Sequence, residues 1–339
     1  MITTEILRQN KIFDWSDIAL RYDKPNLLLG NGFSLQFSEN FSYNSLFNLF
    51  LENCDDTHKD LFSHFGTVNF EQILRYLTYA KKVNELLALP SQPIDIALQN
   101  LKTGLIKTIE TVHPRVENIN FEQLKNVAKQ LKNFGDIFTT NYDLFLYHII
   151  MQSKDISREE KEYIAYQDYY WGSDCPLGFK QFMSTQGYVY KHLYYLHGSL
   201  FIFKNKLEII KLKRDNDETE LIDLISTQIQ DNNFPIFITE GTGLEKQMAI
   251  NENRYLTFCS DKLKVSSQPT VVFGNMLGDF DSHILKALIT KPKDIVYCIF
   301  IGDRSIADVN AEKYNFESKF NNYPNQIEFV DSSTVFKIY

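Results

Sequence analysis

The stretch that decides the fold class runs from Asn26 to Ser34 and reads NLLLGNGFS. Its apolar run, Leu27–Leu29, has the length and character of a buried strand. Gly30 and Gly32 follow directly, and the residues after them have the pattern of a helix start. A buried strand that turns through glycines into a helix is typical of α/β proteins with a parallel sheet.

Two further polar clusters follow strand-like runs in the same manner. Thr139–Asp143 (TTNYD) comes after Ile137–Phe138, and His197–Ser199 (HGS) comes after Leu193–Leu196. Polar residues at the carboxyl ends of parallel strands face the crevice in which α/β proteins bind ligands. We therefore expect these two clusters and the segment Gly30–Ser34 to meet at one edge of the sheet.

The second half of the chain predicts three more strands, at Pro235–Thr239, Thr270–Phe273 and Ile295–Ile301. Helices are predicted between them, at Glu245–Leu263 and Asp281–Leu288. Strands that alternate with helices imply a mainly parallel sheet with helices on both faces. We expect a Rossmann-like α/β fold.

Weaker patterns complete the prediction. Residues 4–22 carry apolar side chains at helical spacing, and Phe201–Phe203 with Leu207–Leu212 has the pattern of a hairpin. Gln326–Val330 and Val335–Tyr339 are expected as edge strands. Residues 155–190, which are rich in tyrosine, are expected to form an ordered excursion from the sheet.

The region between the first two predicted strands has a helical pattern throughout. Asn69 and Asn120 each begin the tetrapeptide NFEQ, an asparagine cap followed by an acidic residue in the first turn. Two helix caps explain these tetrapeptides, and an internal repeat is the alternative. We expect one α/β domain built from residues 1–42 and 133–339, into which residues 43–132 insert as a helical subdomain.

Composition narrows the functional classes. The 339 residues carry a formal net charge of -8, which argues against a dedicated nucleic-acid binder. No apolar stretch approaches the roughly 20 residues that span a bilayer, and a secretory pattern is missing, so we expect a cytoplasmic protein without membrane contact. Metal-ligand spacings such as HExxH or paired CxxC are absent, so no metal site is expected. The widely spaced cysteines are Cys54, Cys175, Cys259 and Cys298.

Two glycine-containing turns are candidates for phosphate contacts. Gly30-x-Gly32 lets the backbone approach a pyrophosphate closely. The full G-x-G-x-x-G spacing is missing, and an ordinary strand-to-helix turn explains the pair equally well. Gly274 and Asn275 follow a very apolar strand and are suited to contact a phosphate and a ribose, or to form a simple turn.

Three side chains have the chemistry of a hydrolytic site. Asn141 and Asp143 lie two residues apart past a strand, so both side chains can point the same way. An Asn amide can anchor a ribose hydroxyl or an attacking water, and an Asp can accept a hydrogen bond from a carboxamide. A helix cap is the alternative for both. His197 is suited to act as a general base, and a structural histidine is its alternative.

In this order, the clusters Gly30–Ser34, Thr139–Asp143, His197–Gly198 and Gly274–Asn275 resemble the sirtuin-like superfamily. The segment Glu240–Leu256 (EGT…K…I…YL) resembles the bacterial branch of antiphage defence, which is related to abortive-infection proteins. This resemblance implies a Rossmann-like sheet with NAD in its crevice.

The resemblance also implies a role for each residue. Asn141 would hold the ribose or the attacking water, Asp143 would bind the nicotinamide carboxamide, and His197 would be the base near the ribose diol. NAD contacts are implied for Gly30, Asn31, Gly32, Phe33, Ser34, Thr140, Gly198, Gly274 and Asn275.

Two departures from sirtuin deacylases narrow the expected activity. The four-cysteine zinc module is absent, and Leu35-Gln36-Phe37 stands where those enzymes have a Pro-Asp-Phe-Arg element. We therefore expect an NAD+ glycohydrolase that yields ADP-ribose and nicotinamide without a metal and acts as a regulated effector. A homo-oligomer is expected, or a defence partner such as an ATPase or an Argonaute-like protein. The alternatives are a non-catalytic sensor of NAD or ADP-ribose, and an ADP-ribosyl transferase or deacylase.

Overall fold

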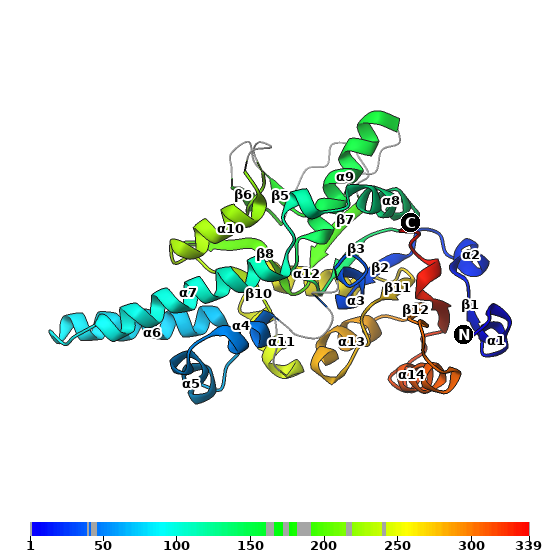
Figure 1. Ribbon diagram of the computed structural model, residues 1–339. Coiled ribbons are helices and arrows are strands. Elements are labelled where there is room, and N and C mark those ends of the chain that lie inside the picture. Colours follow the sequence, from blue (N-terminus) through cyan, green and yellow to red (C-terminus); the bar gives the residue numbers. More distant parts are fainter. Residues whose placement is uncertain are drawn as a thin grey trace.

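An eight-stranded sheet forms the centre of the molecule (Figure 1). The computed structural model describes residues 2–38, 41, 46–160, 166–171, 176–181, 191–214, 219–238 and 242–338. All neighbouring strands of this sheet are parallel, which confirms the predicted Rossmann-like α/β fold. From edge to edge the strands are β1 (Ile12–Phe13), β13 (Ile327–Asp331), β12 (Ile295–Ile299), β11 (Thr270–Phe273), β2 (Asn26–Leu29), β3 (Ile137–Thr139), β7 (Lys191–Tyr195) and β4 (Tyr166–Gln167).

The register of the central strands places their carboxyl ends side by side. Every residue of β12, β11, β2 and β3 is buried, as expected for parallel strands with helices on both faces. Phe273 pairs with Leu29, Leu29 with Thr139, and Thr139 with Tyr195. The segments that follow these strands therefore begin next to one another at one edge of the sheet.

Helices flank this sheet and fill the connections between its strands (Figure 1). The α-helices outside the insertion are α1 (Thr4–Gln9), α2 (Trp15–Ile18), α3 (Asn31–Ser34), α9 (Phe145–Glu160), α10 (Leu221–Gln230), α11 (Gly243–Asn251), α12 (Arg254–Val265), α13 (Ser282–Ile289) and α14 (Ile306–Ser318). Short 3-10 turns occupy Ala19–Arg21, Val116–Asn118, Leu131–Asn133, Asp279–Asp281 and Ser332–Thr334.

The region predicted as a helical insertion contains α-helices in its described part. They are α4 (Leu46–Asn53), α5 (Asp56–His64), α6 (Phe70–Leu86), α7 (Gln92–Val112) and α8 (Phe121–Gln130). Phe47, Phe50, Phe62 and Phe70 pack edge to face at its base. Helices α6 and α7 extend from there as a long hairpin, which we call the arm (Figure 1). Helix α8 instead packs against α9 of the α/β domain.

A second, antiparallel sheet stands beside the first. Its strand order is β10 (Pro235–Phe237), β8 (Gly198–Asn205), β9 (Glu208–Lys211), β6 (Leu177–Phe179) and β5 (Tyr170–Trp171). Strands β8 and β9 form the predicted hairpin, which is therefore confirmed.

The prediction that Pro235–Thr239 adds a strand to the parallel sheet is wrong, because β10 pairs antiparallel with β8. The chain leaves the parallel sheet at Gly198, which has a φ of 74° directly after His197. Strand β8 therefore starts a new sheet and offers its edge to β10. Pro235 has no N–H to donate, which suits an edge strand.

The prediction of one helix over residues 4–22 is also wrong. Helix α1 ends at Gln9, Lys11 takes a φ of 57°, and Ile12 and Phe13 pair with β13 as strand β1. The remaining residues form α2 and a 3-10 turn. Apolar spacing in a short segment does not distinguish a helix from a strand between two helical turns.

Three other elements differ from the prediction. The helix expected at 245–263 is two helices, because the Asn253 side chain caps α12 by accepting hydrogen bonds from the N–H groups of Tyr255 and Leu256 at 3.0 and 3.2 Å. Gln326–Val330 largely coincides with β13, but β1 pairs outside it, so it is not an edge strand. Residues 335–338 are not a strand.

Within the described ranges, none of the helices combines the length and the apolar character needed to cross a membrane. Much of the predicted excursion at 155–190 lies outside the described residues, as do Glu240 and Gly241 of the segment that carried part of the resemblance.

Candidate active site

The glycines of the candidate site let backbone segments approach one another. Gly32 donates its N–H to the carbonyl of Gly274 at 3.0 Å, and a Cβ on Gly32 would lie 2.7 Å from the Cα of Gly274. Gly274 itself has a φ of 69°. The N–H of Gly30 is donated to Phe273 O at 2.9 Å. In this conformation the glycines pack β2 against β11, as the alternative of an ordinary turn predicts.

Asn31 and Phe33 are held by the protein itself. Asn31 donates its side-chain amide to the carbonyl of Phe41 at 2.8 Å. The ring of Phe33 is fully buried against Phe37, Phe273 and Phe336. Both residues therefore shape the turn after β2, and the Phe33 ring is part of the core.

Ser34, Asn141 and Asp143 form one buried hydrogen-bonded group. Asn141 Nδ2 donates to Ser34 Oγ at 2.8 Å and to the carbonyl of Gly30 at 3.0 Å. Ser34 Oγ in turn donates to Asp143 Oδ2. The structure thus brings together residues from α3 and from the segment after β3, as the sequence predicts for the sheet edge.

Both carboxylate oxygens of Asp143 are engaged by protein groups. Oδ1 accepts a hydrogen bond from the N–H of Phe145 at 2.9 Å, which is the helix-start contact considered as an alternative. Burial raises the pKa of Asp143, and the hydrogen bonds from Ser34 and Phe145 oppose this rise. A ligand carboxamide would have to share one of these oxygens with its protein donor or replace that donor.

Thr140 and Asn275 contact each other within the site. Thr140 Oγ1 donates to the carbonyl of Leu29 at 3.2 Å and accepts from Asn275 Nδ2 at 3.3 Å. Asn275 Nδ2 also lies 3.3 Å from Asp281 Oδ2, and Asn275 Oδ1 accepts from the N–H of Leu277 at 2.8 Å. These contacts tie the end of β3 to the segment that follows β11.

His197 is buried and faces a second histidine. Its Nε2 lies 2.7 Å from Nε2 of His283, so one of these nitrogens donates to the other. Burial lowers the pKa of His197 to about 3, while Asp281 and a backbone hydrogen bond to Thr140 act in the opposite direction. His197 is therefore a neutral imidazole at physiological pH.

Gly198 does not leave open space beside His197. A Cβ at this position would lie 2.0 Å from the carbonyl oxygen of Ile236 in β10. The carbonyl of His197 accepts a hydrogen bond from the N–H of Ile238 at 2.8 Å. Gly198 thus permits close contact between the second sheet and the end of β7, which fixes the backbone of His197.

Residues 27–336 match the model of a protein family that is described as a domain of unknown function (DUF4917). The chain belongs to this family. No curated protein matches the chain. The match includes the whole site from Gly30 to His283, so the site is part of the DUF4917 domain itself.

Three polar residues of this DUF4917 domain join the site without having been assigned a role from the sequence. They are Lys246, Asp281 and His283. Lys246 Nζ donates to Asp281 Oδ1 at 3.0 Å. Burial favours the neutral form of Asp281, yet the paired ammonium of Lys246 holds its pKa below the usual value. Asp281 and His283 lie two residues apart at a helix start, and this spacing could have identified both as candidates from the sequence.

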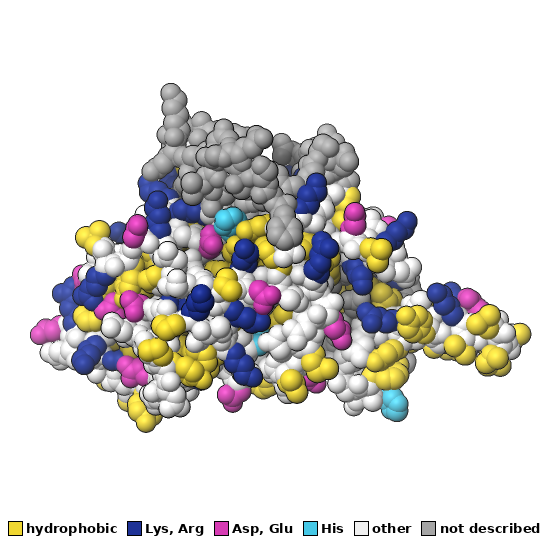
Figure 2. Space-filling view, turned by 180° about the vertical axis from the view of Figure 1, so that it is seen from behind, with side chains coloured by type: hydrophobic (Ala, Val, Ile, Leu, Met, Phe, Trp, Pro, Cys, Tyr) yellow, Lys and Arg dark blue, Asp and Glu magenta, His cyan; other side chains and the backbone are white. Residues whose placement is uncertain are grey.

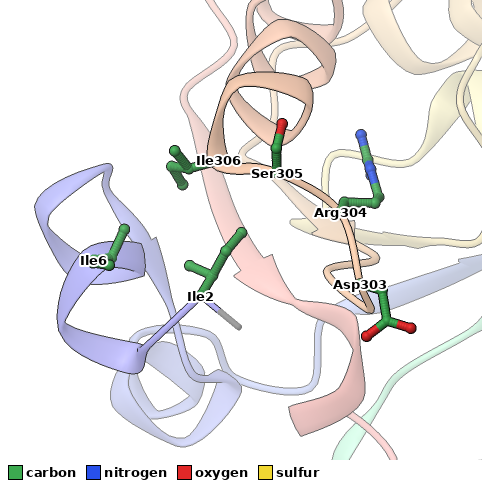
Figure 3. A pocket seen from close by; sticks show the side chains of 6 residues that line it. All are labelled: Ile2, Ile6, Asp303, Arg304, Ser305 and Ile306. Carbon is green, nitrogen blue, oxygen red and sulfur yellow. The ribbon is translucent and has the colours of Figure 1, made fainter.

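A separate surface pocket of about 270 Å³ lies outside the candidate site (Figure 3). Ile2 and Ile6 line it from the side of α1, and the other residues belong to the segment that enters α14, namely Asp303, Arg304, Ser305 and Ile306. Arg304 is paired with Glu312 at 2.6 Å. None of the predicted site residues lines this pocket.

Proposed function

We propose that the protein is an NAD+ glycohydrolase that cleaves NAD+ into ADP-ribose and nicotinamide. The observation that carries the proposal is the meeting of two buried hydrogen-bonded groups at the carboxyl edge of a parallel sheet, where α/β proteins bind ligands. One group joins Ser34, Asn141 and Asp143, and the other joins Thr140, Asn275 and His197.

This reaction mainly requires the protein to orient the substrate and to stabilise the charge that develops on the ribose. Cleavage of an N-glycosidic bond passes through an oxocarbenium-like state, as glycoside hydrolysis does. Both hydrogen bonds of the Asn141 amide use Nδ2, which orients its oxygen Oδ1. We assign this oxygen to a ribose hydroxyl or to the attacking water. Asp143 then positions Ser34, and through it Asn141.

His197 is the proposed base near the ribose diol. Its Nε2 faces His283 in this structure, so a substrate hydroxyl must displace His283 before it reaches this nitrogen. The structure therefore corresponds to a resting state under the proposal. A resting state suits a toxic effector, and we propose antiphage defence as its setting, with a homo-oligomer or a partner protein as the trigger.

A second candidate is a sensor that binds NAD or ADP-ribose without turnover. It is favoured by the engagement of both Asp143 oxygens and of His197 Nε2 by protein groups. Stoichiometric binding without loss of NAD, retained in His197→Ala, would support the sensor.

The test is NAD+ consumption by the purified protein, alone and with the product of its neighbouring gene. We expect release of nicotinamide and ADP-ribose, with a rate at least about 100-fold lower in His197→Ala and Asn141→Ala. His192→Ala is the matched control, because His192 lies near the opposite end of the same strand and contacts Asp136. Wild-type rates in both active-site variants would contradict the assignment, and absence of consumption in every condition would contradict the activity.

A further inference from the structure

His197, Asp281 and His283 form a compact set of metal-ligand atoms, which we call the histidine–aspartate cluster. One ligand atom from each residue lies within 4.8 Å of the other two. His197 follows β7, Asp281 ends a 3-10 turn, and His283 lies in the first turn of α13. We propose that this cluster binds a divalent transition-metal ion such as Zn²⁺.

The two imidazoles already converge on one point. Their Nε2 atoms are 2.7 Å apart, and their ring centroids are 4.9 Å apart. Two imidazole nitrogens on one tetrahedral Zn²⁺, at about 2.05 Å each, are roughly 3.3 Å apart. The two nitrogens therefore need to separate by only about 0.6 Å to share one ion.

Other hydrogen bonds orient the ligands as outer-shell groups do at metal sites. A ligating histidine commonly donates its other ring N–H to a backbone carbonyl, and His197 has a backbone hydrogen bond to Thr140. Lys246 contacts Asp281 Oδ1, whereas Oδ2 has a longer contact of 3.3 Å with Asn275. Asp281 can therefore turn Oδ2 toward an ion while Lys246 stays on Oδ1.

His283 must change its tautomer to bind an ion. His197 uses its other ring N–H on Thr140, so His283 Nε2 donates in the contact with His197. An ion on His283 Nε2 requires the proton on Nδ1, which is buried and has no hydrogen-bond partner in the described residues. Lys246 opposes a nearby dication, and the Asp281 carboxylate offsets this repulsion. We expect binding that is weaker than at a structural zinc site and reversible by chelators.

Metal binding has a consequence that rests on the proposed function. An ion bound to His197 Nε2 occupies the lone pair that the base requires. The ion would therefore inhibit NAD+ cleavage, and release of the ion would free the base.

The first experiment measures binding without any turnover. The chelator-treated protein is titrated with Zn²⁺ in competition with a chromogenic chelator. We expect one equivalent to bind, with at least about tenfold weaker affinity in His283→Ala and in the nearly isosteric Asp281→Asn. His192→Ala should bind Zn²⁺ like the wild type. Circular dichroism establishes that each variant is folded, and Asp281→Asn keeps the side-chain volume if His283→Ala does not fold.

Two outcomes overturn the site: no binding by the wild type, or unchanged affinity in folded Asp281→Asn. The second experiment adds Zn²⁺ to an NAD+ consumption assay of wild-type protein. Undiminished consumption at saturating Zn²⁺ overturns the inhibitory role. Since the titration does not use NAD, failure of the glycohydrolase proposal and failure of the metal site remain distinguishable.

Discussion

At the residue scale, Gly30 occupies the turn where β2, β11 and the side-chain amide of Asn141 meet. A Cβ at this position would lie 2.5 Å from the Gly274 carbonyl oxygen and 2.5 Å from the Cβ of Asn275. Its own carbonyl accepts the hydrogen bond from Asn141. Any displacement of this turn therefore reaches both the sheet and the candidate site.

Gly30→Ala should lower the free energy of unfolding by about 1–3 kcal/mol, because the methyl group meets backbone that cannot move independently. Gly278→Ala is the matched control, since a Cβ there meets nothing within 4 Å. We expect the control to stay within about 0.5 kcal/mol of the wild type. Urea denaturation measures both, and equal stability of the two variants would contradict the packing argument.

At the scale of elements, buried histidines lie where helices end or pack against one another. His113 ends α7, donates from Nδ1 to the carbonyl of Ile109 at 3.1 Å and contacts the Phe41 ring. His148 of α9 packs edge-on against Phe121 of α8. Burial lowers the pKa of each histidine to about 4. Both are therefore neutral in the folded protein at physiological pH.

These shifts predict a loss of stability in acid. The unfolded histidines titrate at about 6.5, so between pH 6.5 and 4 the unfolded state binds more protons than the folded state. Stability therefore falls as the pH drops through this window, by about 2 kcal/mol per histidine between pH 7 and pH 5. His148→Gln should reduce the difference in unfolding free energy between these two pH values. A difference equal to that of the wild type would show that His148 does not contribute.

At the scale of the whole molecule, the arm projects from the body and carries apolar side chains at its end (Figure 2). Leu86 and Leu87 are 86% and 63% exposed. Phe50, by contrast, is fully buried at the base of the same region. The core of this region is thus separate from the end of the arm.

Leu86→Ser with Leu87→Ser should change the free energy of unfolding by less than about 1 kcal/mol, because little area is buried at either position. Phe50→Ala should cost about 3–5 kcal/mol, since it opens a cavity in an aromatic cluster. Thermal and urea unfolding of the two variants compare these values. A large loss in the leucine variant would show that the arm end is buried in solution. The homo-oligomer expected from the resemblance stays a prediction, which the mass of the protein in solution measures.

The sequence by itself determined the central strands of the parallel sheet, β12, β11, β2, β3 and β7, and the polar clusters that follow them. Buried parallel strands are continuous apolar runs, and the polar residues that end them are visible in local order. Asn141, Asp143 and His197 were therefore identified as candidates, and the structure places all three at one sheet edge. Their roles toward NAD stay predictions.

Only the tertiary structure decided which distant residues meet. His283 contacts His197 across 86 positions, because β11 and β7 belong to one parallel sheet and the segments that follow them meet at its carboxyl edge. It also decided that β10 joins a second sheet, since Gly198 turns the chain out of the first. Local periodicity records burial and not strand order, so neither contact could be predicted from the spacing of residues.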